Sequence, residues 1–121
     1  MSQLSKQKLD IGSILTNDIN LITTTVTQGT SITTGVTLRS PGGIISTQSA
    51  SAGTHGTHTF TASHPSVTVD KIVLTNIIGY TGTGSPSVRL QTTQGSFNVT
   101  ITNNHINNSL NAPLRIAYTI L

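Results

Sequence analysis

The sequence has no cysteine and no tryptophan, and only 7% of its 121 residues are charged. The absence of cysteine excludes disulfide bonds, thiolate metal sites and cysteine nucleophiles. Glutamate is absent too, so the only carboxylate side chains are Asp10, Asp18 and Asp70, which are too few and too scattered for a glycosidase pair. No Gly-x-Ser-x-Gly elbow and no phosphate-binding loop occurs. We therefore expect a protein that is not an enzyme and that uses no cofactor.

Long hydrophobic runs and clusters of basic residues are also missing. No segment approaches the length of a membrane span, and the N-terminal residues lack the apolar run of a signal peptide. This predicts synthesis in a cytoplasm and no membrane span. The net charge is +3, but the basic residues are spread over the chain, and only Lys6 and Lys8 are close together. A nucleic-acid surface needs clustered basic residues or stacking aromatics, so no nucleic-acid partner is expected.

What the chain has instead is threonine, which occurs 23 times. Threonine is β-branched and suits the pleated surface of a sheet. Surface charge normally keeps a free protein soluble and discourages the edges of sheets from pairing with neighbours. A β-rich chain without this charge is expected to use its Thr- and Ser-rich faces as contact surfaces. The composition therefore favours a subunit of an assembly, and in particular a homo-oligomer.

Residues 1–18 differ from the rest of the chain, because they hold a third or more of all charges and few β-branched residues. We interpret them as an N-terminal arm that docks on a neighbouring subunit; a loosely tethered tail is the alternative. An arm of this kind needs apolar anchors, and the candidates are Leu4, Leu9, Ile11, Ile14 and Leu15.

Residues 19–121 show short strand patterns separated by Gly, Pro and Asn, without a helical stripe. The predicted strands are 19–27, 30–38, 44–49, 58–62, 67–78, 87–92, 96–102 and 114–121. Eight short strands at regular intervals predict an all-β domain, a β-sandwich with the eight-stranded jelly roll as the leading topology. The last strand is apolar at every second residue, which is typical of a strand that is central or covered by a partner.

Three local patterns add detail to this prediction. Gln28-Gly29 indicates a tight turn between the first two strands, and residues 93–95 indicate a hairpin between the sixth and seventh. The alternation of residues 67–78 changes phase at Asp70-Lys71, as a β-bulge would cause. The residues expected in the core are Phe60, Val69, Val73, Val88, Leu90, Phe97, Val99, Ile101, Ile116 and Tyr118.

Two patterns could carry ligand chemistry. His55, His58 and His64 form an H-x2-H-x5-H cluster, which makes them weak candidates for metal ligands. The simpler interpretation is that they are polar residues of a loop and a strand face, since no second type of ligand is nearby. Tyr80 lies in a Gly-rich loop, where an exposed aromatic ring could contact a sugar.

The segment from residue 28 to residue 121 resembles small β-domains that recur in virion proteins of tailed phages and large DNA viruses. The likeness is carried by TSITTGVTL (30–38), GIISTQS (43–49), YTGTGSP (80–86) and GSF (95–97). It implies a structural protein of a virion, made in the host cytoplasm, as a capsid decoration protein, a minor capsid protein or a fibre head. The partners expected from it are further copies, with a trimer favoured, and other virion proteins such as the major capsid protein. It carries no catalytic residue across.

A different class of function stays open beside this one. Threonine-rich strand faces can match a repetitive surface such as ice or a polysaccharide, which would make the chain a carbohydrate- or surface-binding module of the receptor-binding or ice-binding type. Gln28, Gly29 and Gly35 interrupt the threonine rows of the first strands, and an ice-binding surface needs a regular array. Tyr80 is the one specific residue that the sugar-binding alternative names.

Overall fold

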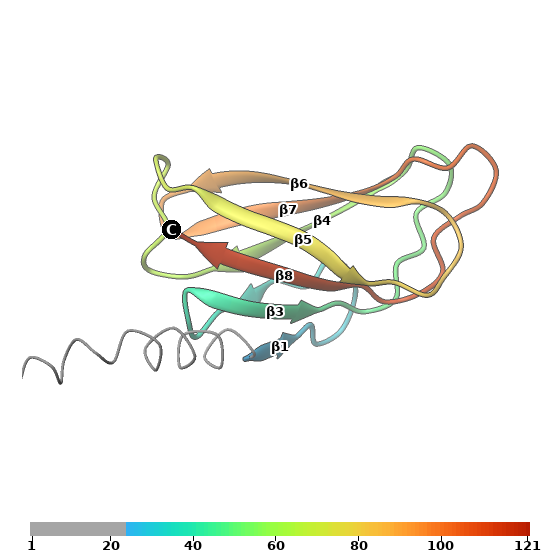
Figure 1. Ribbon diagram of the computed structural model, residues 1–121. Coiled ribbons are helices and arrows are strands. Elements are labelled where there is room, and N and C mark those ends of the chain that lie inside the picture. Colours follow the sequence, from blue (N-terminus) through green and yellow to red (C-terminus); the bar gives the residue numbers. More distant parts are fainter. Residues whose placement is uncertain (1–23) are drawn as a thin grey trace, which may run out of the picture.

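The computed structural model describes residues 24–121, which form an all-β domain of two four-stranded sheets packed together (Figure 1). The predicted arm, 1–18, lies outside these residues, as do its anchors. Sheet A has the order β1 (Thr25–Thr27), β3 (Gly42–Ser46), β8 (Arg115–Ile120) and β5 (Val73–Gly79). Sheet B has the order β2 (Val36–Thr37), β4 (Thr57–Ser63), β7 (Ser96–Asn103) and β6 (Pro86–Thr93). The predicted β-sandwich is confirmed at this level.

The core lies between the sheets and follows the period-two alternation of the strands. In β7 the side chains of Phe97, Val99 and Ile101 are fully buried. In β8 every second side chain points inward, and Tyr118 is 1% exposed. Its hydroxyl donates a hydrogen bond to the carbonyl oxygen of Ser40, and burial raises the pKa of Tyr118. Because β8 lies between β3 and β5, the prediction of a central or covered last strand is confirmed.

The hairpin between β6 and β7 is confirmed as well. The ladder ends at the pair Thr93 and Ser96, which leaves Gln94 and Gly95 as the turn. Gly95 has a φ of 84°, a left-handed conformation that glycine adopts without steric cost.

The predicted tight turn at Gln28-Gly29 is wrong as a hairpin, because β1 belongs to sheet A and β2 to sheet B. The reason is that Gln28 is a buried residue, 1% exposed. Its side-chain amide donates to the carbonyl oxygens of Ile32 and Thr34, both at 2.9 Å, and its Oε1 accepts from the backbone N–H of Gln48 at 2.9 Å. These bonds fold residues 28–34 into a loop that carries the chain from one sheet to the other. Each of β1 and β2 pairs with its neighbour in parallel.

The predicted bulge at Asp70-Lys71 is also wrong, and so is the predicted burial of Val69. Residues 69 and 70 form a turn, closed by a bond from the N–H of Lys71 to the carbonyl oxygen of Thr68, and β5 begins only at Val73. Val69 is 65% exposed because it lies in this turn. The register of β5 shifts at its other end, next to Gly79. The remaining core predictions are buried, or half-buried against the core in the case of Val73, Val88 and Leu90.

Candidate functional site

The outer face of sheet B is a surface of hydroxyl and amide groups, which we call the threonine face. It arises because β4, β6 and β7 each place every second residue outward, and in this chain those residues are polar. The members of the threonine face are Thr57, Thr59, Thr61, Ser63, Ser87, Arg89, Gln91, Thr93, Ser96, Asn98, Thr100 and Thr102. Arg89 is its single charged residue.

Side chains of the threonine face bond to one another across the strands. The hydroxyls of Thr59 and Thr100 are 3.1 Å apart, and Thr61 donates to the Oδ1 atom of Asn98 at 2.8 Å. At the hairpin the hydroxyls of Thr93 and Ser96 are 2.9 Å apart. Several of its polar groups are therefore already satisfied within the sheet.

The outer face of sheet A has a different chemistry. Ile72, Leu74 and Leu121 are 60%, 55% and 58% exposed, and we call these three the apolar cluster. The N–H of Leu121 donates to the carbonyl oxygen of Ile72 at 2.9 Å, which places the two residues side by side. Leu74 is two residues further along β5 and shares the face of Ile72. The cluster lies at the end of the domain where the chain leaves β8, next to β5, which is the last strand of the sheet in the described residues (Figure 1).

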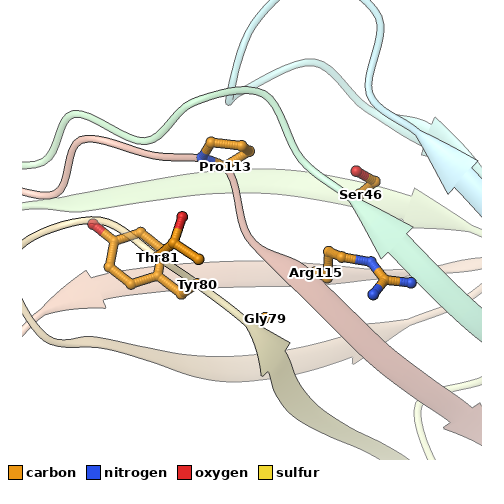
Figure 2. A pocket seen from close by; sticks show the side chains of 6 residues that line it. All are labelled: Ser46, Gly79, Tyr80, Thr81, Pro113 and Arg115. Atoms are coloured by element: carbon orange, nitrogen blue, oxygen red, sulfur yellow. The ribbon is translucent and has the colours of Figure 1, made fainter.

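A pocket of about 250 Å³ lies at the opposite end of sheet A (Figure 2). Its floor is a row across three strands, since Arg115 of β8 pairs with Ser46 of β3 on one side and with Gly79 of β5 on the other. The loops at this end supply the walls. The lining residues are Ser46, Gly79, Tyr80, Thr81, Pro113 and Arg115, and we call this the Tyr80–Arg115 pocket.

Hydrogen bonds between the loop after β5, which contains Tyr80 and Thr83, and the loop before β8, which contains Asn111, hold the wall of the pocket. The hydroxyl of Tyr80 donates to the carbonyl oxygen of Thr83 and accepts from the N–H of Asn111. The N–H of Thr83 donates to Oδ1 of Asn111 at 2.8 Å, and its hydroxyl donates to the carbonyl oxygen of Ser109 at 2.6 Å. A Cβ atom at Gly82 would overlap the side chain of Asn111 and would lie 2.7 Å from the Tyr80 hydroxyl, so only glycine leaves room for this contact.

The structure does not bring the three candidate histidines together. His58 starts the inner side of β4 and His64 follows its other end, so the two are separated by about 20 Å of extended strand. The Nε2 atom of His58 accepts from the N–H of Ser51 at 3.0 Å, and Nδ1 of His64 accepts from the N–H of Ser66 at 3.1 Å. His55 is exposed and has a positive φ of 59°. Within residues 24–121, no group of three His, Cys, Asp or Glu side chains could hold a metal ion.

Among the residues within 24–121 that the sequence singled out as ligand contacts, Tyr80 lines this pocket. Arg115 and Ser46 were missed, because the pairing of β3, β5 and β8 that aligns them cannot be read from spacing along the chain. The threonine face had a signal in the alternation of THTFTAS (57–63) and SFNVTIT (96–102), but its size depends on those two strands being neighbours.

Comparison with known proteins adds no family. No protein-family model, no curated protein and no solved structure matches this chain. The resemblance to virion proteins therefore stays a prediction. In the part of the chain that the structure describes, no helix has the length and apolar character that crossing a membrane requires.

Proposed function

We propose that this chain is a non-catalytic structural subunit that associates with further copies of itself through the apolar cluster, at one end of the outer face of sheet A. This proposal replaces the Thr- and Ser-rich faces, which the composition alone favoured as contact surfaces. The observation that carries the proposal is the apolar cluster of Ile72, Leu74 and Leu121, each more than half exposed, beside the terminal strand β5. Large apolar side chains that adjoin on a surface mark interaction sites. An end strand also offers unpaired backbone groups to a neighbour.

The sparse charge supports a second copy as the occupant of this surface. The described residues contain five charged side chains, Arg39, Asp70, Lys71, Arg89 and Arg115. Asp70 and Lys71 precede the cluster and have charges of opposite sign, and the three side chains of the cluster are uncharged. Covering this surface therefore desolvates few charges, so that most of the free energy of apolar burial is retained.

The finer parts of the proposal come from the resemblance to virion proteins. In that setting the subunit is a capsid decoration protein, a minor capsid protein or a fibre head, located in the virion, with a homotrimer as the favoured assembly and a jelly roll as the topology. The six strands from β3 through β8 pair with one another in antiparallel, which is consistent with a jelly roll. The parallel pairs that β1 and β2 form are additions to that topology. The docking arm, 1–18, would bind other virion proteins, such as the major capsid protein.

Sedimentation of the full chain over the micromolar range tests the proposed association. A stable trimer, or another closed oligomer, is the expected result. A clean, soluble monomer at high micromolar concentration would show that the surface has no second copy on it. If that monomer binds a hydrophobic dye only after residues 1–18 are deleted, the chain's own N-terminal segment covers the cluster.

The deletion of residues 1–18 also tests the arm. The truncated chain should keep the circular dichroism of a folded β domain and should associate less with its partners. An unfolded truncated chain would mean that the segment belongs to the core of the domain.

A second candidate function rests on the threonine face. Its hydroxyls repeat at about 6.7 Å along a strand and about 4.8 Å between strands, which is the kind of regular array that an ice or polysaccharide surface could match. Asn98, Arg89 and Gln91 interrupt the array, and the cross-strand bonds already use several hydroxyls. A thermal-hysteresis assay and a glycan array distinguish this function, with Thr59→Lys as the variant that should abolish a positive signal.

A further inference from the structure

The Tyr80–Arg115 pocket combines a free cation with a rigid apolar wall. Arg115 is exposed at the pocket floor, and within residues 24–121 its guanidinium has no ion-pair or hydrogen-bond partner. Asp70 is the only acidic side chain in this part of the chain, and it precedes β5, whereas Gly79 beside Arg115 ends that strand. The length of β5, about 20 Å, therefore separates the two charges. A guanidinium offers paired donors that match a carboxylate in a bidentate geometry.

The apolar wall lies across the pocket from this cation. Figure 2 shows Tyr80 and Thr81 on one side, Arg115 and Ser46 on the other, and Pro113 between them. The bonds from the Tyr80 hydroxyl to Thr83 and Asn111 fix the ring before any ligand arrives. A ring that is already held loses little conformational freedom on binding, which favours affinity.

The aliphatic stem of Arg115 lies close to Gly79. A Cβ atom at Gly79 would lie 3.4 Å from both the Cβ and the Cδ atoms of Arg115, so the stem runs close over this glycine. The absence of a side chain at residue 79 thus keeps the floor of the pocket open between Arg115 and Tyr80. The hydroxyls of Ser46 and Thr81 complete the lining and can donate or accept hydrogen bonds.

The size and chemistry of the pocket select one class of ligand. A volume of about 250 Å³ is slightly below the range for drug-sized ligands, which suits a single sugar unit. An aromatic ring and a proline suit the C–H face of a sugar, two hydroxyls suit its OH groups, and a single arginine suits one carboxylate. A phosphate or sulfate would gain from the cation but would leave the apolar wall unused.

We infer that the Tyr80–Arg115 pocket binds a carboxylate-bearing sugar unit, of the sialic or uronic acid class. The carboxylate lies on the Arg115 guanidinium, the apolar face of the sugar lies on the Tyr80 ring, and Ser46 and Thr81 bond to its hydroxyls. This site goes beyond the proposed assembly and does not depend on it, because the pocket and the apolar cluster lie at opposite ends of sheet A.

Titration of the isotope-labelled full chain by NMR tests the inference. The probes are N-acetylneuraminic acid and glucuronic acid, with methyl glucoside as the neutral sugar. Both acids, or one of them, should shift the amide signals of residues 46, 79–81 and 113–115 in the millimolar range. The neutral sugar should bind at least about tenfold more weakly, because it lacks the charge-assisted bonds to arginine.

Variants assign the binding to the named residues. Arg115→Gln should weaken binding of the acidic sugar about tenfold or more, and Arg115→Lys should weaken it less but measurably, since a lysine has no planar fork. The matched control is Arg89→Gln, which removes the same charge from the threonine face and should leave binding unchanged. Arg115 is exposed, so its variants are expected to fold, and the dispersion of the spectrum verifies this in the same experiment.

Three outcomes with the wild type or with Arg115→Gln would overturn the inference. They are no shift of the pocket signals with either acid, equal binding of the neutral sugar, and unchanged binding in a folded Arg115→Gln variant. A loss of binding in Arg89→Gln as large as in Arg115→Gln would also overturn it, because the effect would then come from net charge and not from the pocket. None of these results depends on the oligomeric state of the chain.

Discussion

The two outer faces of this sandwich are built from the same kind of strand but present different surfaces. On sheet B the outward residues are hydroxyls and amides that bond to one another, as Thr59 does with Thr100. On sheet A the outward residues include the apolar cluster at one end and the Arg115 guanidinium at the other. Within residues 24–121 the Arg115 guanidinium has no hydrogen-bond or ion-pair partner, and the three side chains of the apolar cluster are each more than half exposed.

The outer face of sheet A therefore has more capacity to bind a partner than the outer face of sheet B. A surface whose polar groups already bond to one another gains little from a partner, because those bonds must be exchanged for new ones. A surface with exposed apolar area and an unpaired cation gains by burial and by charge-assisted bonding. Charged residues are rare throughout the strands of both sheets, so composition alone does not distinguish the two outer faces.

The two sheets share one core, and Phe97→Ala is the variant with the largest expected effect on it. Phe97 is fully buried on the inner face of sheet B. Removing its ring should lower the free energy of unfolding by about 3–5 kcal/mol, from lost burial and a residual cavity. Chemical denaturation measures this. The matched control is Val69→Ala, at a residue that is 65% exposed, and it should change stability by less than about 0.5 kcal/mol. A comparable loss in both variants would contradict the core described here.

The rigid pocket end of sheet A can be tested at Gly82. An added Cβ would lie 2.8 Å from the Cβ of Ala112 as well as against Tyr80 and Asn111, so Gly82→Ala should cost about 1–3 kcal/mol by overpacking. The same substitution at Gly29, where nothing lies within 4 Å, is the control and should be close to neutral. Thermal unfolding compares the two. If Gly82→Ala were as stable as Gly29→Ala, the two loops would not be in the contact that holds the Tyr80 ring.

The threonine face should respond weakly to the loss of one hydroxyl. Thr100→Val keeps the shape and the β-branched side chain but removes the bond to Thr59, and water can replace this bond at an exposed position. The expected loss is about 0.2–1 kcal/mol, the range of a cross-strand pair. Thr102→Val serves as the reference in the same denaturation series. Thr102 belongs to the same face, and its hydroxyl takes no part in the side-chain bonds given above. A loss above about 2 kcal/mol would mean that the face is not an independent surface layer.

The smallest expected effect is a dependence of stability on pH at His58, on the inner side of sheet B. Burial lowers the pKa of His58 below its ordinary value of 6.5. The unfolded chain therefore takes up the proton at a higher pH than the folded chain does, so stability is full above pH 6.5 and falls slightly as the pH is lowered through this value. Protonation would also remove the Nε2 acceptor from the N–H of Ser51. His58→Gln should remove this part of the decline in melting temperature, and an unchanged decline would contradict the assignment.

Much of the fold could be predicted from the sequence where the signal is local. The alternation in 96–102 and 114–121 gave the two strands that bring Phe97 and Tyr118 into the core, and the turn before Ser96 has the glycine that its φ requires. Prediction was wrong where a buried polar group changed the path of the chain. Gln28 looked like a turn residue, but its side chain bonds to backbone groups that are distant from it in sequence.

The candidate site was less predictable because it too depends on contacts between residues that are distant in sequence. Tyr80 was identified because aromatic residues are rare and the loop around it is rich in glycine. Arg115 lies in an ordinary alternating strand, and its place beside Ser46 and Gly79 results from strand pairing between distant segments. Whether Leu74 belongs to an inner or an outer face likewise depends on where β5 begins, and the misplaced bulge at Asp70-Lys71 obscured that start.

Sedimentation equilibrium of three chains at matched concentration tests whether the apolar cluster, at one end of the outer face of sheet A, is the contact surface between copies. The three chains are the wild type, Leu74→Lys in the apolar cluster, and Thr59→Lys in the threonine face. Both variants add one positive charge to an exposed residue of an outer face. The wild type and Thr59→Lys should form an oligomer, and Leu74→Lys should be a folded monomer, because a lysine would be desolvated in the contact. An oligomer that survives Leu74→Lys and dissociates in Thr59→Lys would show that the copies associate through the threonine face and not through the apolar cluster.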